Sequence, residues 1–280
     1  MLLFIKRLCI LLLLTMVTQI GVYVALKTIL DHKSEFRLSR YFRHPLHQIY
    51  ILGNSRAVNS VNEQYATQSR HADLINLGFN GMNYQTIKAL INDINAKQSN
   101  ANLLIEITSL LEDKEDDNYA YYMGNSPFMH VQYKNTKYEY LHLMRLNNEL
   151  FLRNIYYLRK SDADWVNKYT ISENLIEETR TLALNDTTLG NRPLLIERMQ
   201  NIVATCNQHN NKAVFFLAPY YPEYLKKLTQ YPALIDTIQS LHTFTFHDLN
   251  TLQIPTNGFS DRIHTNVTSS LQISDYLLSH

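Results

Sequence analysis

The sequence predicts an α/β fold of three layers, in which helices cover both faces of a central parallel sheet. Three short segments, 48–52, 103–107 and 212–217, are continuous apolar runs bounded by turn residues. Such runs are typical of strands that are buried on both faces, as they are in parallel sheets. Segments with the apolar spacing of amphipathic helices alternate with these strands, and this alternation favours the layered architecture. A chain of 280 residues is long enough for one globular domain with a sizeable core.

The N-terminal residues 1–30 predict a transmembrane signal anchor. Lys6 and Arg7 precede the uncharged stretch 8–26, which is rich in Leu, Ile and Val and close to the ~20 residues that cross a bilayer as a helix. A cleaved signal peptide is the alternative, but the apolar run is longer than a usual signal core and no small-x-small cleavage site follows it. Basic residues flank the span on both sides and do not fix its orientation. A short basic head before a long single domain favours a domain outside the cytoplasm, in the periplasm or at the cell surface.

Residues 31–47 are charged and basic, and we interpret them as a juxtamembrane connector. Such a segment can lie against anionic headgroups or serve as a solvated linker. The α/β domain is then expected to extend over 48–280.

Within this domain, strands and helices are expected to alternate along the chain. Their ranges, from strand to helix in turn, are 48–52, 62–70, 72–77, 85–96, 103–107, 193–207, 212–217 and 267–278. The stretch from about 112 to 190 breaks the alternation, because it begins with an acidic run and continues through Tyr-rich helical segments such as 138–159. We interpret it as a helical insertion, either a subdomain or a lid beside the site.

Candidate functional residues follow the predicted strands, where the loops of parallel α/β folds gather reactive groups. Ser55 lies in the turn 53–56 directly after the first strand. Gly53 would permit a tight bend there, and the start of a helix would supply unpaired N–H groups that can stabilise an oxyanion. Gly-x-Ser alone is a weak signal, because both are ordinary turn residues.

Asp261 and His264 lie three positions apart in a loop before the last predicted helix. A tight turn can place both side chains on one side, so that the carboxylate holds one imidazole nitrogen while the other faces Ser55. The three residues would then provide the nucleophile, the base and the orienting carboxylate that acyl transfer requires.

The ordered blocks 51–56, 76–81 and 261–264 resemble those of the SGNH (GDSL-like) hydrolases. The resemblance is to the membrane-anchored branch that includes cell-envelope polysaccharide O-acyltransferases and their accessory proteins. It implies an SGNH or flavodoxin-like fold, with Ser55 as the nucleophile, His264 as the base and Asp261 as the residue that orients it. It also implies that Gly81 donates its backbone N–H to the oxyanion.

Two positions depart from the family pattern. The segment 104–109 lacks the Asn that in many members donates to the oxyanion, and loss of one such donor typically costs ~100- to 1000-fold in rate. Asn54 stands where an acidic residue is common, and Arg56 could bind an anionic group or pair with a surface carboxylate. The candidates to replace the missing donor are Asn80, Asn83 and Thr108.

We therefore expect a serine-dependent acyltransferase or esterase that acts, through acyl-Ser55, on an extracytoplasmic polysaccharide or other envelope glycan, with acetyl as the favoured acyl group. The resemblance implies work beside a multi-span membrane acyltransferase. The alternative is a catalytically weak or inactive domain that binds glycan or assists assembly of such an enzyme. The missing Asn favours this alternative, and the retained Ser, Asp and His oppose it. A plain lipase or secreted esterase fits less well, because the chain is expected to keep its anchor.

Composition argues against other classes. Lys and Arg total 26 against 25 Asp and Glu, for a net charge of +1, which gives no support to nucleic-acid binding. The histidines are scattered without ligand spacing, so neither a metal site nor a cofactor is expected. Cys9 lies in the apolar N-terminal stretch and Cys206 in the later body of the chain, so a stabilising disulfide is not expected either.

Overall fold

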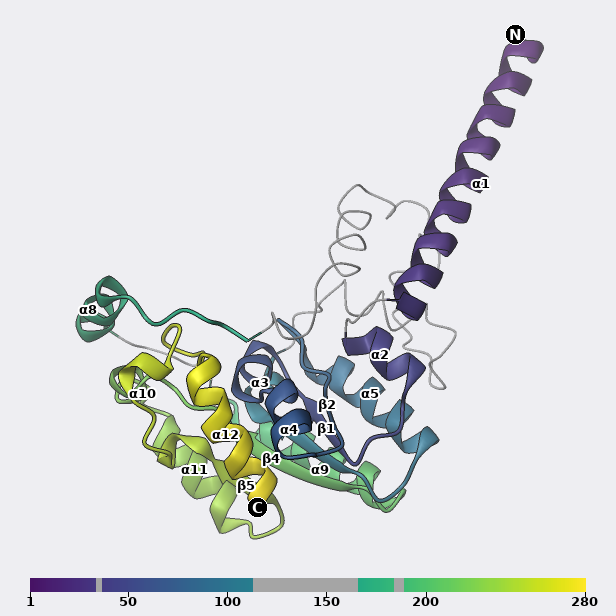
Figure 1. The fold of residues 1–280 in the computed structure, drawn as a ribbon. Helices are drawn as coiled ribbons and strands as arrows, with labels where there is room; N and C mark the ends of the chain where they lie inside the picture. The colour runs from purple at the N-terminus through teal and green to yellow at the C-terminus, as the bar shows by residue number, and fades with distance from the viewer. Residues whose placement is uncertain (34–36, 113–165, 184–188) are drawn as a thin grey trace. The chain divides into compact units, whose positions relative to one another are not determined.

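The computed structural model describes residues 1–33, 37–112, 166–183 and 189–280 (Figure 1). Most of the predicted insertion, including the acidic run after residue 112 and the segment 138–159, lies outside the described residues. The chain divides into two compact units, one that contains Met1–His44 and one that contains the described residues from Pro45 onward.

The first unit holds two helices, α1 (Leu2–Lys33) and α2 (Arg37–Arg43). All of the predicted anchor 1–30 except its first residue therefore lies within one continuous helix. Large apolar side chains are exposed along its first half, among them Phe4, Leu12 and Val17. Among the residues that the structure describes, none of the helices is both long enough and apolar enough to cross a membrane.

The second unit is built on a parallel sheet, which confirms the predicted α/β class. The strand order is β2-β1-β3-β4-β5 in the part of the chain that the structure describes. All four strand pairings are parallel, and Tyr50 of β1, for example, pairs with Ile75 of β2 and Leu103 of β3. The strands are β1 (Ile49–Leu52), β2 (Leu74–Asn76), β3 (Asn102–Glu106), β4 (Lys212–Leu217) and β5 (Thr245–Asp248).

Helices pack in two groups on this sheet. One group consists of α3 (Ser55–Ser60), α4 (Glu63–Ser69) and α12 (Val267–Ser279), with α12 in contact with both others. The other consists of α5 (Tyr84–Lys97), α9 (Arg192–Asn207) and α11 (Tyr231–Ser240), with α9 in contact with both others and with β4. The other helices among the described residues are η1 (Ile107–Leu110), α8 (Glu173–Thr181), α10 (Pro222–Leu225), η3 (Leu249–Thr251) and η4 (Thr256–Gly258).

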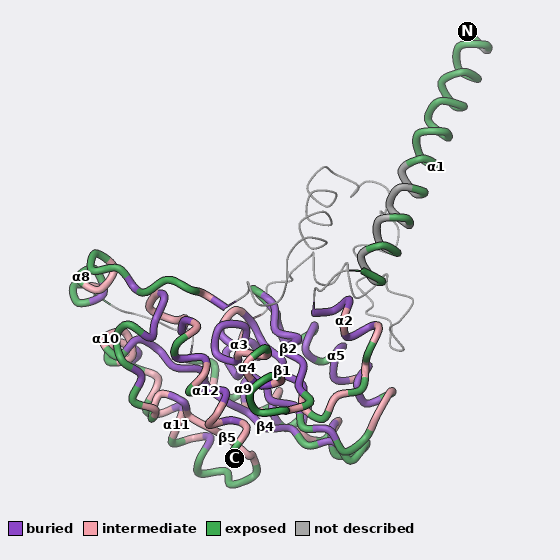
Figure 2. The backbone as a smooth tube through the Cα atoms, viewed as in Figure 1, coloured by how far each residue is buried: buried purple, intermediate pink, exposed green. Residues whose placement is uncertain are grey.

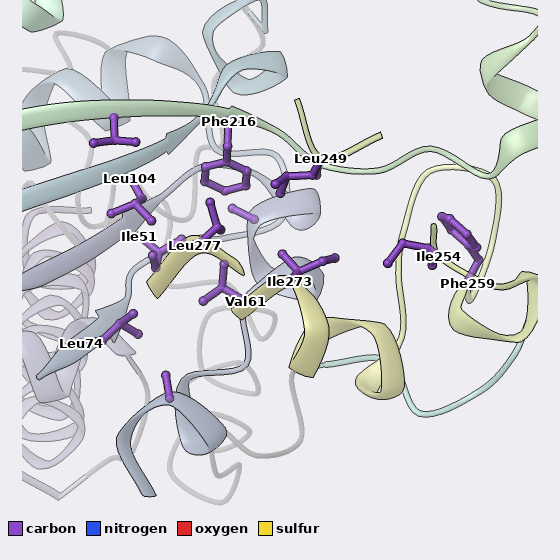
Figure 3. Close-up of a cluster of buried hydrophobic side chains, with 14 of the residues drawn as sticks. Ile51, Val61, Leu74, Leu104, Phe216, Leu249, Ile254, Phe259, Ile273 and Leu277 are labelled. Atoms are coloured by element: carbon purple, nitrogen blue, oxygen red, sulfur yellow. The ribbon is translucent and has the colours of Figure 1, made fainter. Parts of the chain in front are cut away.

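The core beneath the first helix group joins the sheet to α12. Ile51, Leu104 and Phe216 extend from three neighbouring strands toward Ile273 and Leu277 of α12 (Figure 3). The tube in Figure 2 shows the strands β1 to β4 as mostly buried segments, as continuous apolar runs predict, whereas the residues of β5 are only partly buried. Because strand side chains alternate between faces, the intervening apolar residues of the same strands serve the opposite face, where α9 contacts β4. Three layers result.

Asparagine side chains begin five of the helices that the structure describes. In each case the side-chain oxygen accepts a hydrogen bond from a backbone N–H of the first turn, which satisfies one donor that the helix leaves unpaired. These N-caps are Asn54 for α3, Asn62 for α4, Asn83 for α5, Asn191 for α9 and Asn266 for α12.

Candidate active site

Ser55, His264 and Asp261 form one continuous hydrogen-bonded chain. Ser55 is the first residue of α3, directly after β1, and the other two lie in the loop before α12. The Ser55 Oγ to His264 Nε2 distance is 2.7 Å, and the His264 Nδ1 to Asp261 Oδ2 distance is also 2.7 Å. With its proton on Nδ1, the imidazole donates to the carboxylate and accepts the serine hydroxyl at Nε2. The structure thus brings together the three residues that the sequence singled out.

The loop that carries His264 is closed by its own hydrogen bonds. Asp261 Oδ1 accepts from the backbone N–H groups of Ile263 at 2.8 Å and His264 at 2.9 Å. Ser260 N–H donates to the His264 carbonyl at 2.9 Å, which closes the turn from the other side. The carboxylate therefore shapes the loop with one oxygen and orients the imidazole with the other.

The same contacts set the charge of Asp261. Burial acts to raise the pKa of this carboxyl, but hydrogen bonds from the His264 ring and from the Ile263 and His264 backbone favour the charged form. The pKa of Asp261 consequently lies below its ordinary value. An ionised carboxylate at neutral pH is the form that can accept the His264 Nδ1 proton and stabilise an imidazolium.

The turn that presents Ser55 depends on Gly53. Its φ is +150°, in a region that favours glycine. A Cβ at this position would lie 2.8 Å from both Ala57 Cβ and Glu106 Cβ. The absence of a side chain therefore lets the end of β1 lie tightly against α3 and β3. Asn54 then caps α3 by accepting from Arg56 N–H at 2.9 Å, so that Ser55 occupies the first helical position.

The second predicted block, 76–81, lies beside this turn. Leu77 N–H donates to Ile51 O and Phe79 N–H to Gly53 O, both at 2.9 Å. Met82 N–H donates to Phe79 O at 3.0 Å, and Gly81 has a φ of +78°, the signature of a type II turn with glycine in its third position. Asn80 and Gly81 are exposed on this turn.

Two of the candidate donors have roles within the protein. Asn83 is almost fully buried and caps α5, with its side-chain oxygen accepting from Thr86 N–H at 3.0 Å. The Thr108 hydroxyl donates to Glu106 Oε2 at 2.5 Å and accepts from Asn54 Nδ2 at 3.1 Å. Its hydrogen is therefore used inside the protein, which removes Thr108 as a replacement for the missing oxyanion donor.

Glu106 was not predicted as a site residue, yet it is the centre of a buried polar network. It is 0 % exposed at the end of β3. Oε1 lies 3.3 Å from Arg56 Nε, and Oε2 accepts from Thr108 N–H at 3.0 Å as well as from its hydroxyl. A charged residue within the apolar run 103–107 was the one signal that the sequence offered. Buried carboxylates require partners of this kind.

The structure corrects the expected partner of Arg56. We expected it to bind an anionic group or to pair with a surface carboxylate. It does pair with a carboxylate, but with the fully buried Glu106, and Arg56 itself is 4 % exposed. Its guanidinium also donates to the carbonyls of Ile263, at 3.0 Å, and Ala218, and its central carbon lies 3.6 Å from the centroid of the Tyr220 ring.

Other reactive groups are less suited to catalysis. Burial raises the pKa of the Cys206 thiol to about 12, so this residue stays a thiol at neutral pH and is a poor nucleophile. Within the described ranges, no group of three His, Cys, Asp or Glu residues could hold a metal ion.

Comparisons with known proteins leave the family open. No protein-family model matches the chain, and no curated protein matches it. Among solved structures, the chain is similar to the protein YxiM from Bacillus subtilis, with a TM-score of 0.40 and 10 % sequence identity. The alignment covers 83 % of this chain and 55 % of that one. The chain thus spans about half the length of YxiM, and a likeness at this level carries no inference about activity.

Proposed function

We propose that this protein is a serine-dependent esterase or acyltransferase that works through a covalent acyl-Ser55 intermediate. The observation that carries the proposal is the relay from Ser55 Oγ to His264 Nε2 and from His264 Nδ1 to Asp261, with both distances at 2.7 Å. A nucleophile in contact with its base, and a base held by a third group, is the arrangement that activates a serine.

In the first half-reaction, Ser55 Oγ attacks the carbonyl carbon of an ester as His264 Nε2 takes the hydroxyl proton. The bond from this carbon to the alcohol oxygen then breaks, and His264 returns the proton to the leaving alcohol. The product is acyl-Ser55. In the second half-reaction, water or a sugar hydroxyl gives its proton to His264 and attacks the acyl carbon, which releases acid or a new ester and restores Ser55.

The developing oxyanion requires donors near the nucleophile. Ser55 N–H is the first of helix α3 and has no acceptor within that helix. Gly81, on the turn that is hydrogen-bonded to the end of β1, is the second backbone donor that we propose. Asn80, exposed on the same turn, is the side-chain donor that we propose, since the Thr108 hydroxyl donates to Glu106 and Asn83 is buried at the start of α5.

The finer features of the proposal are an envelope glycan as acceptor, acetyl as acyl group, an extracytoplasmic domain and a membrane acyltransferase as partner. They are supported by the resemblance of the blocks 51–56, 76–81 and 261–264 to membrane-anchored SGNH proteins. The N-terminal helix α1, with exposed Leu, Ile and Phe side chains, is the membrane anchor in this proposal.

Fluorophosphonate labelling of the full-length protein tests the activity. We expect a single phosphonylated site at Ser55, identified by mass spectrometry, and hydrolysis of p-nitrophenyl acetate. Ser55→Ala should abolish both. Ser69→Ala, the same change at an exposed serine of α4, should alter neither. Absence of labelling in the wild-type protein would refute catalysis and favour the non-catalytic glycan-binding or assembly domain.

The envelope role has a separate test. In cells whose envelope O-acylation depends on this protein, the acylation should disappear with Ser55→Ala and persist with Ser69→Ala. Persistence of acylation with both variants would refute the transferase role while leaving esterase activity intact.

A further inference from the structure

Arg56 makes a second connection alongside the proposed catalytic hydrogen bond. Ser55 and Arg56 are consecutive on α3, and Ile263 and His264 are consecutive in the loop before α12. Ser55 Oγ lies 2.7 Å from His264 Nε2, and Arg56 Nη1 donates to the Ile263 carbonyl at 3.0 Å. Two neighbouring residues of the helix therefore hold two neighbouring residues of the loop.

The peptide group between Ile263 and His264 is consequently held at both ends. Its carbonyl oxygen accepts from Arg56, and its N–H donates to Asp261 Oδ1 at 2.9 Å. Because a peptide group is planar, two anchors on opposite sides fix the plane from which the His264 side chain departs. Asp261 holds this plane from within the loop, and Arg56 holds it from α3.

Arg56 can act as a fixed anchor because its own position is set on three sides. Its Nε lies 3.3 Å from Glu106 Oε1, its Nη2 donates to the Ala218 carbonyl, and its guanidinium stacks on the Tyr220 ring. The planar guanidinium presents its donors in a rigid fork. Lysine offers a single ammonium on a flexible stem and cannot meet the same acceptors with the same geometry.

We propose that Arg56 is a positioning residue that sets the place of His264 relative to Ser55, and that Glu106 fixes the orientation of Arg56. The inference rests on the proposed function, in which His264 takes the Ser55 proton. It assigns the Arg56 guanidinium, beside the serine, to the alignment of His264, whereas the sequence left anion binding and pairing with a surface carboxylate as the two alternatives. A misplacement of about 1 Å at such a contact can cost about 100-fold in rate.

The first test compares two variants of Arg56 with a matched control in the full-length protein. Arg198 also stacks on a tyrosine, Tyr84, and donates to a carbonyl, that of Leu110. We expect Arg56→Lys and Arg56→Met to slow fluorophosphonate labelling of Ser55 by about 10- to 100-fold, and Arg198→Met to leave it within about twofold of wild type. Arg56→Lys should keep the thermal midpoint near that of wild type while labelling slows. Labelling of Arg56→Lys at the wild-type rate would show that charge alone suffices and would overturn the inference.

A second measurement does not depend on activity. The proton on His264 Nδ1, hydrogen-bonded to Asp261, should give a downfield proton NMR resonance that His264→Gln removes. We expect this resonance to shift or broaden in Arg56→Lys and to stay unchanged in Arg198→Met. An unchanged resonance in Arg56→Lys would overturn the positioning role.

If the wild-type protein is not labelled at all, the proposed function fails, and the resonance alone decides whether Arg56 aligns His264 with Asp261. Should Arg56→Met fail to fold, the double variant Arg56→Met with Glu106→Gln, which removes both buried charges together, replaces it in the labelling measurement.

Discussion

Replacement of Gly53 by alanine would add one methyl group at the end of β1, where the chain turns toward Ser55. The new Cβ would lie 2.8 Å from Ala57 Cβ, 2.8 Å from Glu106 Cβ and 3.1 Å from Ser109 Oγ. Carbon atoms pack best about 3.5 to 4.0 Å apart, so both carbon contacts would be too short by about 0.7 Å or more. Each Cβ is attached directly to the backbone of α3 or β3, and relief therefore requires movement of one of these elements.

The cost has two parts. Overpacking of a buried site costs about 1 to 3 kcal/mol, and a side chain at φ +150° adds strain of about 1 to 3 kcal/mol. Gly53→Ala should therefore lower the free energy of unfolding by about 2 to 6 kcal/mol, against a total of about 5 to 15 kcal/mol for a typical domain. Labelling of Ser55 should slow as well, because the serine lies two residues beyond the displaced backbone.

Urea denaturation of the full-length protein, followed by circular dichroism, measures the effect. The double variant Gly53→Ala with Ala57→Gly removes one of the two clashing carbons and should recover part of the packing cost. Gly21→Ala is the matched control, because a Cβ at Gly21 meets nothing within 4 Å. A Gly53→Ala protein within about 0.5 kcal/mol of wild type, the usual range of neutral substitutions, would refute the reasoning.

Three further predictions concern the polar groups around the site. The lowered pKa of Asp261 stabilises the fold fully above its unfolded-state pKa of about 3.9, and this contribution is lost as the pH falls from there through the folded-state pKa. Asp261→Asn should therefore lose less thermal stability than wild type between about pH 5 and pH 3. The fully buried Asn76 side chain donates to Val61 O and accepts from Gly78 N–H, both at 3.0 Å. Asn76→Ala would leave both partners unsatisfied, at about 1 to 3 kcal/mol each. It should therefore lower the free energy of unfolding, measured by urea denaturation, by about 2 to 6 kcal/mol. Arg56→Met and Glu106→Gln should each lower the free energy of unfolding by about 3 to 5 kcal/mol, because each leaves a buried charge unpaired. If the double variant loses as much stability as the two single variants added together, the two residues are not coupled and the reasoning is contradicted.

The strands were predictable where burial on both faces leaves a continuous apolar run. The prediction for β4 matches its observed bounds, and those for β1 and β3 are within one residue at each end. The strand β5 was missed because only Phe246 in Thr245–Asp248 is strongly apolar. This strand lies at the edge of the sheet and all four of its residues are only partly buried, so its sequence carries little of the pattern that marks a central strand. The helix α11 was also missed.

The hydrogen-bonded set of Ser55, His264 and Asp261 could be predicted because the chemistry proposed for it restricts residue type and order. Ser55, Asp261 and His264 each follow from the requirements of nucleophile, carboxylate and base. Arg56 and Glu106 could not be paired in the same way, since arginine and glutamate are mostly exposed in proteins. Their pairing exists only because β1 lies beside β3 in the sheet, which places residue 56 next to residue 106. Sheet order is a property of the whole domain and not of either segment.

The hydrogen bond from Ser55 to His264 also has a consequence for folding kinetics. It joins residues that are 209 positions apart in the chain, and closure of so long a loop is slow and entropically costly until intervening structure shortens the effective distance. The serine should therefore become reactive only after the sheet and α12 have assembled around it. Fluorophosphonate added at intervals during refolding would then label only the chains whose domain has folded completely. Secondary structure measured in parallel should form before the first labelled chains appear.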